Sequence, residues 1–241
     1  MKKEISAKFA FIDSHRLFEI VQNLLDKIED AKTGVDATIK RNSVDVFSAL
    51  FDSMTQGVSL SKWFEQEISI KSQKTWQNSM GLFHQDVLGS FHGWKDLGTG
   101  NVVDIVNHER KIIAEIKNKH NTTKGNHKTA IYKDFRKLLH AEYKGYTAYY
   151  VEVIPKPGKR YDRCFTPSDN RTKRRLRKRS DIRMIDGYSF YDLAGQEKDV
   201  LPRIYKELPG IIGFLLQKSP SYIEEDSLFM KLFNGVYQHE E

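Results

Sequence analysis

Hydrophobic positions recur with a helical period along the first third of the chain. In DSHRLFEIVQNLLDKIED an apolar stripe follows Asp13 or Ser14, either of which can cap a helix. The stripe consists of Leu17, Phe18, Val21, Leu24, Leu25 and Ile28. The segments SVDVFSALFDSM from Ser43 and LSKWFEQEISIKSQKTWQNSMGLFHQDVLGSF from Leu60 repeat the period, with a break near residues 55–58. We therefore expect helices here, acting as a scaffold.

After the glycines of GWKDLGTGN the period shortens to two. NVVDIVNHERKIIAEIKNK (101–119) predicts two short strands, and GYTAYYVEVIP (145–155) predicts a third. KTAIYKDFRKLLHAEY, between them, predicts an amphipathic helix; its inward positions are Ile131, Phe135, Leu138 and Leu139. YSFYDLAG and the helical EKDVLPRIYKELPGIIGFLLQK follow. This order predicts an α/β fold, a mixed central β-sheet flanked by helices with further helices at the N-terminus.

No linker divides the chain, so we expect a single domain over residues 1–241. Its parts are an N-terminal helical part (about 1–60), a core (about 61–155), and a basic region with C-terminal helices (about 156–241). Cys164 is the single cysteine, which excludes an internal disulfide or a cysteine-rich zinc site. No signal peptide or membrane-length apolar run is present, so a cytoplasmic location is expected.

Charged residues interrupt the first two predicted strands. Asp104 sits in one apolar run, and Glu115 and Lys117 flank a single isoleucine in the other. A hairpin turning around NHER would pair residues whose numbers sum to 217, placing Asp104 opposite Ile113 with Glu115 as its diagonal neighbour. All three charges then share one face. The other, apolar face holds Val103, Ile105, Ile112, Ala114 and Ile116.

Two converging carboxylates repel each other unless a hard divalent cation lies between them. Mg²⁺ fits, with Asp104, Glu115 and the Ile116 carbonyl as oxygen ligands, and Lys117 beside it can position or deprotonate an attacking water. The alternative is a solvated polar face on an edge hairpin, with Asp104 as an acid near the turn. The pattern alone leaves both interpretations open.

The arrangement resembles a known nuclease superfamily. The expected hairpin carries Asp104, then ten residues, then Glu115-Ile116-Lys117, and a helix and a strand follow it. This order resembles the PD-(D/E)XK nucleases, and the chain resembles a type II restriction endonuclease. NSMGLFHQDVLGS, AEIKNKHNT and IDGYSFYDLAG resemble the enzymes that cut GGNCC-type sites. The likeness covers about residues 73–204, and the N-terminal helices lie outside it.

The resemblance implies a Mg²⁺-dependent, sequence-specific endonuclease of a restriction-modification system that leaves 5′-phosphates. Asp104 and Glu115 would bind the metal and Lys117 would serve the water. Val103 stands where the family usually has proline, which leaves the aspartate's assignment intact. Many members add a Glu or Gln from the preceding helix. Gln85 is nearest the matching HQ pair, with Gln77 and Glu67 as alternatives.

Positive charge is concentrated in one segment. The chain carries +7 overall, whereas residues 156–183 hold 12 Lys or Arg against 3 Asp, a net of +9. Such a segment fits phosphate binding, and guanine is read by bidentate arginine. The residues expected to contact DNA are Arg171, Lys173, Arg174, Arg175, Arg177 and Asn118. A palindromic site predicts a homodimer. The competing hypotheses are a structure-specific resolvase or repair nuclease, and a DNA-binding protein without catalysis.

Overall fold

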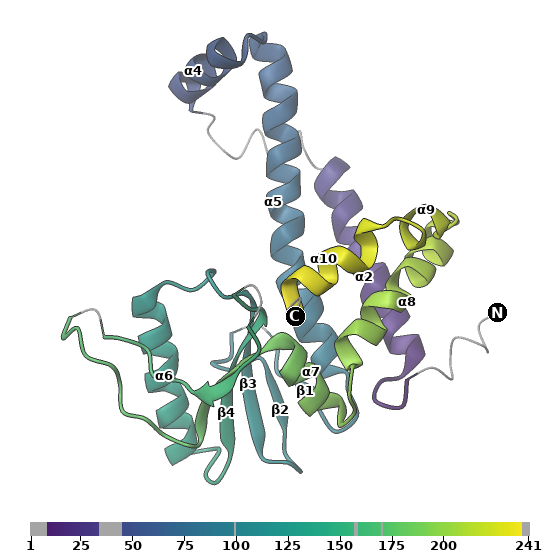
Figure 1. The fold of residues 1–241 in the computed structure, drawn as a ribbon. Coiled ribbons are helices and arrows are strands. Elements are labelled where there is room, and N and C mark those ends of the chain that lie inside the picture. The colour runs from purple at the N-terminus through teal and green to yellow at the C-terminus, as the bar shows by residue number, and fades with distance from the viewer. Residues whose placement is uncertain (1–8, 34–44, 99, 157–158, 170, 238–241) are drawn as a thin grey trace. The chain divides into compact units, whose positions relative to one another are not determined.

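The computed structural model describes residues 9–33, 45–98, 100–156, 159–169 and 171–237 (Figure 1). They form two compact units. The first comprises the described residues up to Ile20 together with those from His84 onward, and the second comprises those of Val21–Phe83. In the described part of the chain no helix is long and apolar enough to cross a membrane.

The second unit is helical. It contains the later part of α2 (Ser14–Thr33), all of α4 (Val46–Gln56) and most of α5 (Leu60–Gly89). Asp45 caps α4 by accepting hydrogen bonds from the Phe47 and Ser48 amides, and the Trp63 indole donates to Asp52 at 2.8 Å. The three expected helices are confirmed, although residues 43 and 44 of the expected second segment lie outside the described residues.

The first unit is built on a six-stranded sheet in the order β1-β2-β3-β4-β6-β5. The strands are β1 (Lys95–Asp96), β2 (Ile105–Asn107), β3 (Ile112–Lys119), β4 (Thr147–Ile154), β5 (Asp162–Cys164) and β6 (Ile182–Asp186). β3, β4 and β6 run parallel to one another, whereas β1–β2, β2–β3 and β5–β6 pair antiparallel. The expected α/β fold with a mixed sheet flanked by helices is therefore confirmed.

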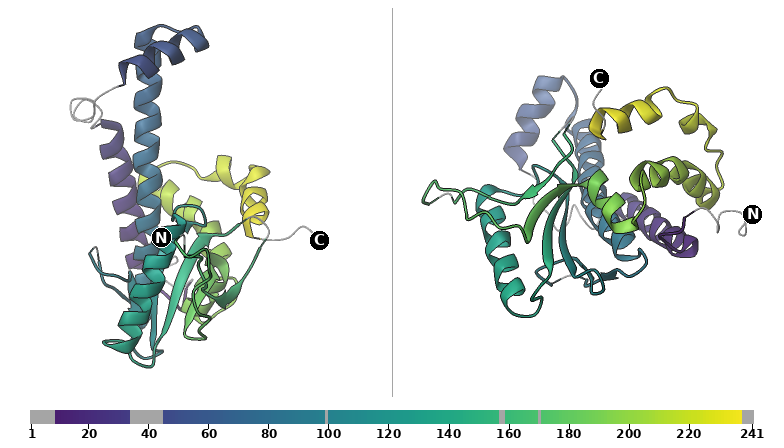
Figure 2. Two further views of the ribbon diagram at one scale, coloured as in Figure 1. Left: turned by 90° about the vertical axis from the view of Figure 1, so that its left-hand side faces the viewer. Right: turned by 60° about the horizontal axis from the view of Figure 1, so that its bottom comes forward.

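Helices cover both faces of this sheet. α6 (Gly125–His140) connects β3 to β4 and lies on one side, while α7 (Gly187–Gly195) lies on the other (Figures 1 and 2). The α6 side holds a buried apolar cluster that includes Ile113, Phe135 and Tyr150. On the α7 side Phe190 packs against Tyr149, with their ring centroids 5.8 Å apart.

Aromatic contacts join the C-terminal helices to this unit. α8 (Val200–Leu216), α9 (Ser221–Glu224) and α10 (Leu228–Tyr237) follow α7. Tyr205 of α8 stacks on Phe229 of α10 at 4.8 Å, and Phe233 of α10 lies 6.5 Å from Tyr188 of α7. The C-terminal helices therefore extend the aromatic core that begins on the sheet.

The register expected for the β2–β3 hairpin is wrong by two residues. Ile105 pairs with Ala114 and Asn107 with Ile112, so paired numbers sum to 219. The turn is therefore His108–Lys111, in which the Asn107 side chain accepts from the Arg110 amide at 2.8 Å and Lys111 takes a left-handed φ of 54°. A shift of two residues preserves the alternation of faces along the two strands, so the grouping of the three charges stands. Val103 departs from the expectation, because it is buried in the same cluster as Val106 and Ile113.

The expectation that only one face of the hairpin packs is also wrong. Val106 and Ile113 share the face of the charged residues and are fully buried in the cluster under α6. Because α6 returns over this face to reach β4, it covers the part near the turn. The charges of β3 lie on the same face, further towards the C-terminal end of the strand.

Candidate active site

Asp104, Glu115 and Lys117 are brought together at the β2–β3 ladder. Asp104 lies just before β2, where its Oδ2 accepts a hydrogen bond from the Ile116 amide at 2.6 Å. Glu115 is 9% exposed, and its Oε1 lies 2.5 Å from the Lys117 ammonium. The three residues that the sequence singled out therefore form one constellation.

The two carboxylates disfavour each other's charge. Burial, and then the charge of Asp104, raise the pKa of Glu115 to about 7, while Lys117 opposes the shift. Burial also raises the pKa of Asp104, and the charge of the nearby Asp96 raises it further. The hydrogen bond from the Ile116 amide and the charge of Lys117 lower this pKa. A cation at this position would relieve the repulsion between them.

Gln85 reaches the site through a second aspartate. Its buried amide donates from Nε2 to Asp96 Oδ1 at 3.0 Å, and Asp96 also accepts from the Gly98 amide at 2.7 Å. Gly89 permits this approach, because a Cβ there would lie 2.8 Å from the Cβ of Asp96. The sequence reasoning missed Asp96, which sits in a short polar stretch without periodicity.

The alternatives to Gln85 lie elsewhere in the chain. Gln77 and Glu67 belong to the second unit, where Glu67 pairs with Lys71 at 3.5 Å. Gln85 belongs to the first unit, which also contains the two carboxylates and Lys117.

The donor set suits a hard cation. Among the described residues no cluster of three or more His, Cys, Asp or Glu side chains is placed to hold a metal ion. Two carboxylates with main-chain oxygen and water are, however, the ligands that Mg²⁺ accepts in proteins, and zinc-type nitrogen and sulfur donors are not needed. Asp104 and Glu115 thus fit a Mg²⁺ site with few protein ligands.

The basic region is folded rather than a free tail. Phe165 stacks on Tyr150 with ring centroids 4.7 Å apart, and the Tyr132 hydroxyl donates to the Arg177 carbonyl at 2.5 Å. Asp169 closes a turn by accepting from the Arg171 amide at 2.8 Å. The cations predicted to contact DNA are all exposed: Arg171, Lys173, Arg174, Arg175 and Arg177. Asn118, near the end of β3, is half-buried.

A further buried carboxylate, Glu152, is a residue that the sequence reasoning missed. It lies on β4, paired in register with Lys117, and is 2% exposed. Its signal was present, because Glu152 interrupts the apolar strand YYVEVI just as Asp104 and Glu115 interrupt theirs.

Comparison with known proteins places this chain in a family. The family model described as Eco47II restriction endonuclease matches residues 9–217. The type II restriction enzyme Eco47II of Escherichia coli is 37% identical over 235 residues, covering 94% of this chain and 98% of the relative. The type II restriction enzyme Sau96I of Staphylococcus aureus is 29% identical over 206 residues, covering 83% and 78%. No solved structure matches the chain. The chain therefore belongs to the Eco47II restriction endonuclease family, and it is a type II site-specific deoxyribonuclease.

Proposed function

We propose that this enzyme is Mg²⁺-dependent and cuts double-stranded DNA at a GGNCC-like palindrome, leaving 5′-phosphate ends. The observation that carries the proposal is the constellation of Asp104, Glu115 and Lys117, with Glu115 and Lys117 joined at 2.5 Å. The GGNCC-like site rests on the sequence resemblance. The names of both relatives, which are type II restriction enzymes, support a DNA substrate.

We assign Asp104 and Glu115 as the carboxylates that would hold Mg²⁺, with the Ile116 carbonyl as a third oxygen. When bound, Mg²⁺ supplies charge neutralisation at the phosphate and lowers the pKa of a coordinated water. The raised pKa of Glu115 supports this assignment, because a buried carboxylate next to another one favours a bound cation.

Lys117 acts on the reacting phosphate. Its ammonium, half-buried beside Glu115, is placed to donate to oxygens that gain negative charge as water attacks phosphorus. The bond from phosphorus to the 3′ oxygen breaks, which leaves a 5′-phosphate and a 3′-hydroxyl. Gln85 supports the site indirectly, by holding Asp96.

DNA recognition falls to the basic region. We assign five of its exposed cations as contacts to phosphates and guanines: Arg171, Lys173, Arg174, Arg175 and Arg177. Asn118, near the end of β3, is assigned a contact to the DNA close to the cut. A palindromic target calls for a homodimer whose two-fold axis matches that of the site. We propose that both compact units serve one nuclease domain, working in the cytoplasm.

Digestion of a DNA of known sequence tests the assignment. With Mg²⁺ the wild type should give fixed fragments whose mapped ends lie at one palindrome. Glu115→Ala and Lys117→Ala should cut at least ~100-fold more slowly, since each removes a group acting on the transition state. Lys119→Ala is the matched control, because Lys119 is an exposed lysine two residues further along β3. Binding to the same DNA without metal should persist in all three variants.

Each competing hypothesis has its own outcome in this experiment. Preference for branched DNA regardless of sequence would indicate a structure-specific nuclease. DNA binding without any cleavage by the wild type would indicate a non-catalytic protein. If both active-site variants cut as fast as the control, the assignment of Glu115 and Lys117 is wrong.

A further inference from the structure

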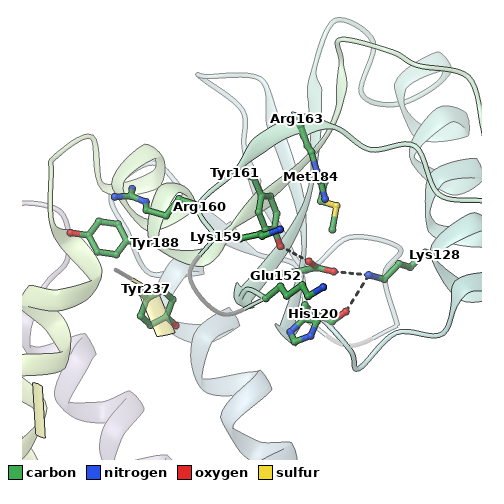
Figure 3. Close-up of a pocket in the computed structure, with 11 residues that line it drawn as sticks. His120, Lys128, Glu152, Lys159, Arg160, Tyr161, Arg163, Met184, Tyr188 and Tyr237 are labelled. Atoms are coloured by element: carbon green, nitrogen blue, oxygen red, sulfur yellow. Dashed lines mark hydrogen bonds and ion pairs between the residues drawn. The ribbon is translucent and has the colours of Figure 1, made fainter. Parts of the chain in front are cut away.

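A cation-lined cavity of about 1140 Å³ lies in the first unit (Figure 3). Among the residues that the structure describes, its walls carry five basic side chains and one carboxylate: Lys128, Lys156, Lys159, Arg160, Arg163 and Glu152. Lys156, Lys159, Arg160 and Arg163 lie in the basic region, but they are not among the five cations assigned above to DNA recognition. The excess of positive charge marks the cavity as a site for an anion.

The one carboxylate is already neutralised within the floor of the cavity. Glu152 accepts from the Lys128 ammonium at 2.6 Å and from the Tyr161 hydroxyl, as Figure 3 shows. Lys128 also donates to the His120 carbonyl at 3.2 Å and lies over the Tyr150 ring. Because Glu152 and Lys128 balance each other, the remaining four cations set the charge that a ligand meets.

Those four cations are exposed, and they form the solvent-facing rim of the cavity. Lys156, Lys159 and Arg163 are exposed, and none of them forms an ion pair with any residue that the structure describes. Arg160 is held more firmly, with its guanidinium 3.9 Å from the centre of the Tyr188 ring and 3.3 Å from the Ser189 hydroxyl. Its carboxylate partner Asp192 is at 3.9 Å, so the pairing is loose.

A buried histidine nitrogen in the cavity also favours an anionic ligand. His120 lines the cavity, and its Nδ1 is buried without a hydrogen-bond partner within the described ranges. A buried polar atom of this kind is normally satisfied by protein, water or ligand. A phosphate oxygen is a suitable partner, because a ring N–H at Nδ1 can donate to it.

The cavity is adjacent to the candidate active site. Glu152 on β4 is the in-register neighbour of Lys117 on β3, so both side chains point to the same face of the sheet, about 4.8 Å apart at the backbone. Duplex DNA carries one phosphate per about 3.4 Å of each strand. A strand whose scissile phosphate lies at Lys117 and that runs across the sheet towards β4 would therefore bring a neighbouring phosphate to this cavity.

We propose that the cavity binds a backbone phosphate of the cleaved strand, next to the scissile one, through Lys156, Lys159 and Arg163 at its rim. The inference rests on the proposed DNA-cleaving function and adds an interaction that fixes the strand's position relative to Lys117. The Lys128–Glu152–Tyr161 floor keeps the rim in place and leaves its charge unopposed.

The test compares two pairs of exposed lysines. The double variant K156A/K159A removes two charges from the rim, and K206A/K231A removes two from the C-terminal helices. Affinity for a duplex is measured without metal over a range of salt. K156A/K159A should lower the magnitude of the slope of log affinity against log salt by about 0.9 for each phosphate that the variant no longer neutralises. K206A/K231A should keep the wild-type slope.

Phosphate ethylation interference on a cleavable duplex then locates the bound phosphate. The wild type should show interference at phosphates beside the mapped cut, and K156A/K159A should show none there. Equal slopes and equal maps for the two double variants would overturn the proposal, and a cavity serving a free phosphoryl ligand would give that result.

Wild-type cleavage of the same duplex with Mg²⁺ tests the proposed function separately. If the wild type fails to cut, the proposed function fails, while the salt slopes still report on the cavity. Far-ultraviolet circular dichroism and the unfolding midpoint of each variant distinguish weaker phosphate binding from a disrupted fold.

Discussion

Unlike an isolated surface carboxylate, Glu115 is buried and lies beside the charged groups of Asp104 and Lys117. Burial and Asp104 raise its pKa to about 7, while Lys117 at 2.5 Å favours its charged form. The net effect is a carboxyl that binds its proton more tightly than an exposed glutamate, so a bound cation would favour its charged form. This single residue therefore connects the packing of the sheet to the chemistry proposed for the β2–β3 pair.

Gln85, Gln77 and Glu67 lie on the helix before the hairpin, and each is a candidate for the residue that supports the metal site. Gln85→Ala should lower the cleavage rate by ~10- to 100-fold, the usual cost of removing a residue that orients a ligand-bearing group. Gln85 holds Asp96, whose charge acts on Asp104. Gln77→Ala and Glu67→Ala should cut at close to the wild-type rate. Single-turnover cleavage over a range of Mg²⁺ concentrations measures the effect, and an equal loss in either comparison variant contradicts the choice of Gln85.

Among the elements, the junction of β6 and α7 has no room for a side chain at Gly187. A Cβ there would lie 2.3 Å from the Val153 carbonyl oxygen and 2.6 Å from the Val153 Cα, both in the backbone of β4. Gly187→Ala should lower the free energy of unfolding by ~1–3 kcal/mol, because the added methyl group would force the backbone of β4 to move. Urea denaturation measures this quantity.

Gly210, within α8, provides the comparison for this substitution. A Cβ at Gly210 meets nothing within 4 Å, so Gly210→Ala should stabilise the protein by ~0.5–1 kcal/mol. If both alanines changed the free energy of unfolding alike, close packing at Gly187 would not be the cause.

The contact between α5 and α7 predicts a pH dependence of stability. His84 meets the Tyr191 hydroxyl at 2.8 Å, and burial lowers its pKa from 6.5 to about 4. The unfolded chain therefore binds more protons between those two pH values, so the free energy of unfolding should fall as the pH drops from about 6.5 to 4. His84→Gln should show a shallower fall in urea denaturation at pH 7 and pH 5. The exposed His92→Gln should follow the wild type, and a wild-type slope in His84→Gln would refute the idea.

Periodicity located the long helices and β2, β3 and β4, because each buries a regular stripe or an alternating face. It missed β1, β5 and β6, which have two, three and five residues and are too short to show a period beside polar or basic neighbours. The hairpin register was wrong because the apolar pattern fixes only which face a residue takes. The Asn107 side chain and Lys111, which shape the turn, decide between registers two residues apart.

The candidate site was visible in the sequence to the extent that charges interrupt apolar strands. That signal identified Asp104, Glu115 and Lys117, and it was equally present at Glu152. Asp96 gave no such signal, because only the fold carries its strand to Gln85. The cavity beside Lys117 was likewise beyond the sequence, since it combines α6, β4 and β5 with the helices near the C-terminus.

For the whole molecule, a palindromic target predicts two active sites, one for each strand. Mixing wild-type subunits with excess Glu115→Ala subunits should produce heterodimers that cut one strand only. Supercoiled plasmid carrying a single site should then accumulate as open circles, and the wild type alone should give linear DNA. Agarose electrophoresis separates the two products. Linear DNA as the sole product at every mixing ratio, with a monomeric mass by sedimentation, would contradict the homodimer.

The turn at His108–Lys111 has a consequence for finding distant relatives. The ladder closes at Asn107 and Ile112, so residues added within the turn would leave the pairing of the two strands, and hence the two carboxylates, unchanged. The ten-residue interval between Asp104 and Glu115 is thus a property of this particular loop and not a requirement of the chemistry. A sequence profile with a variable gap at this turn should detect homologues that a fixed-length pattern overlooks.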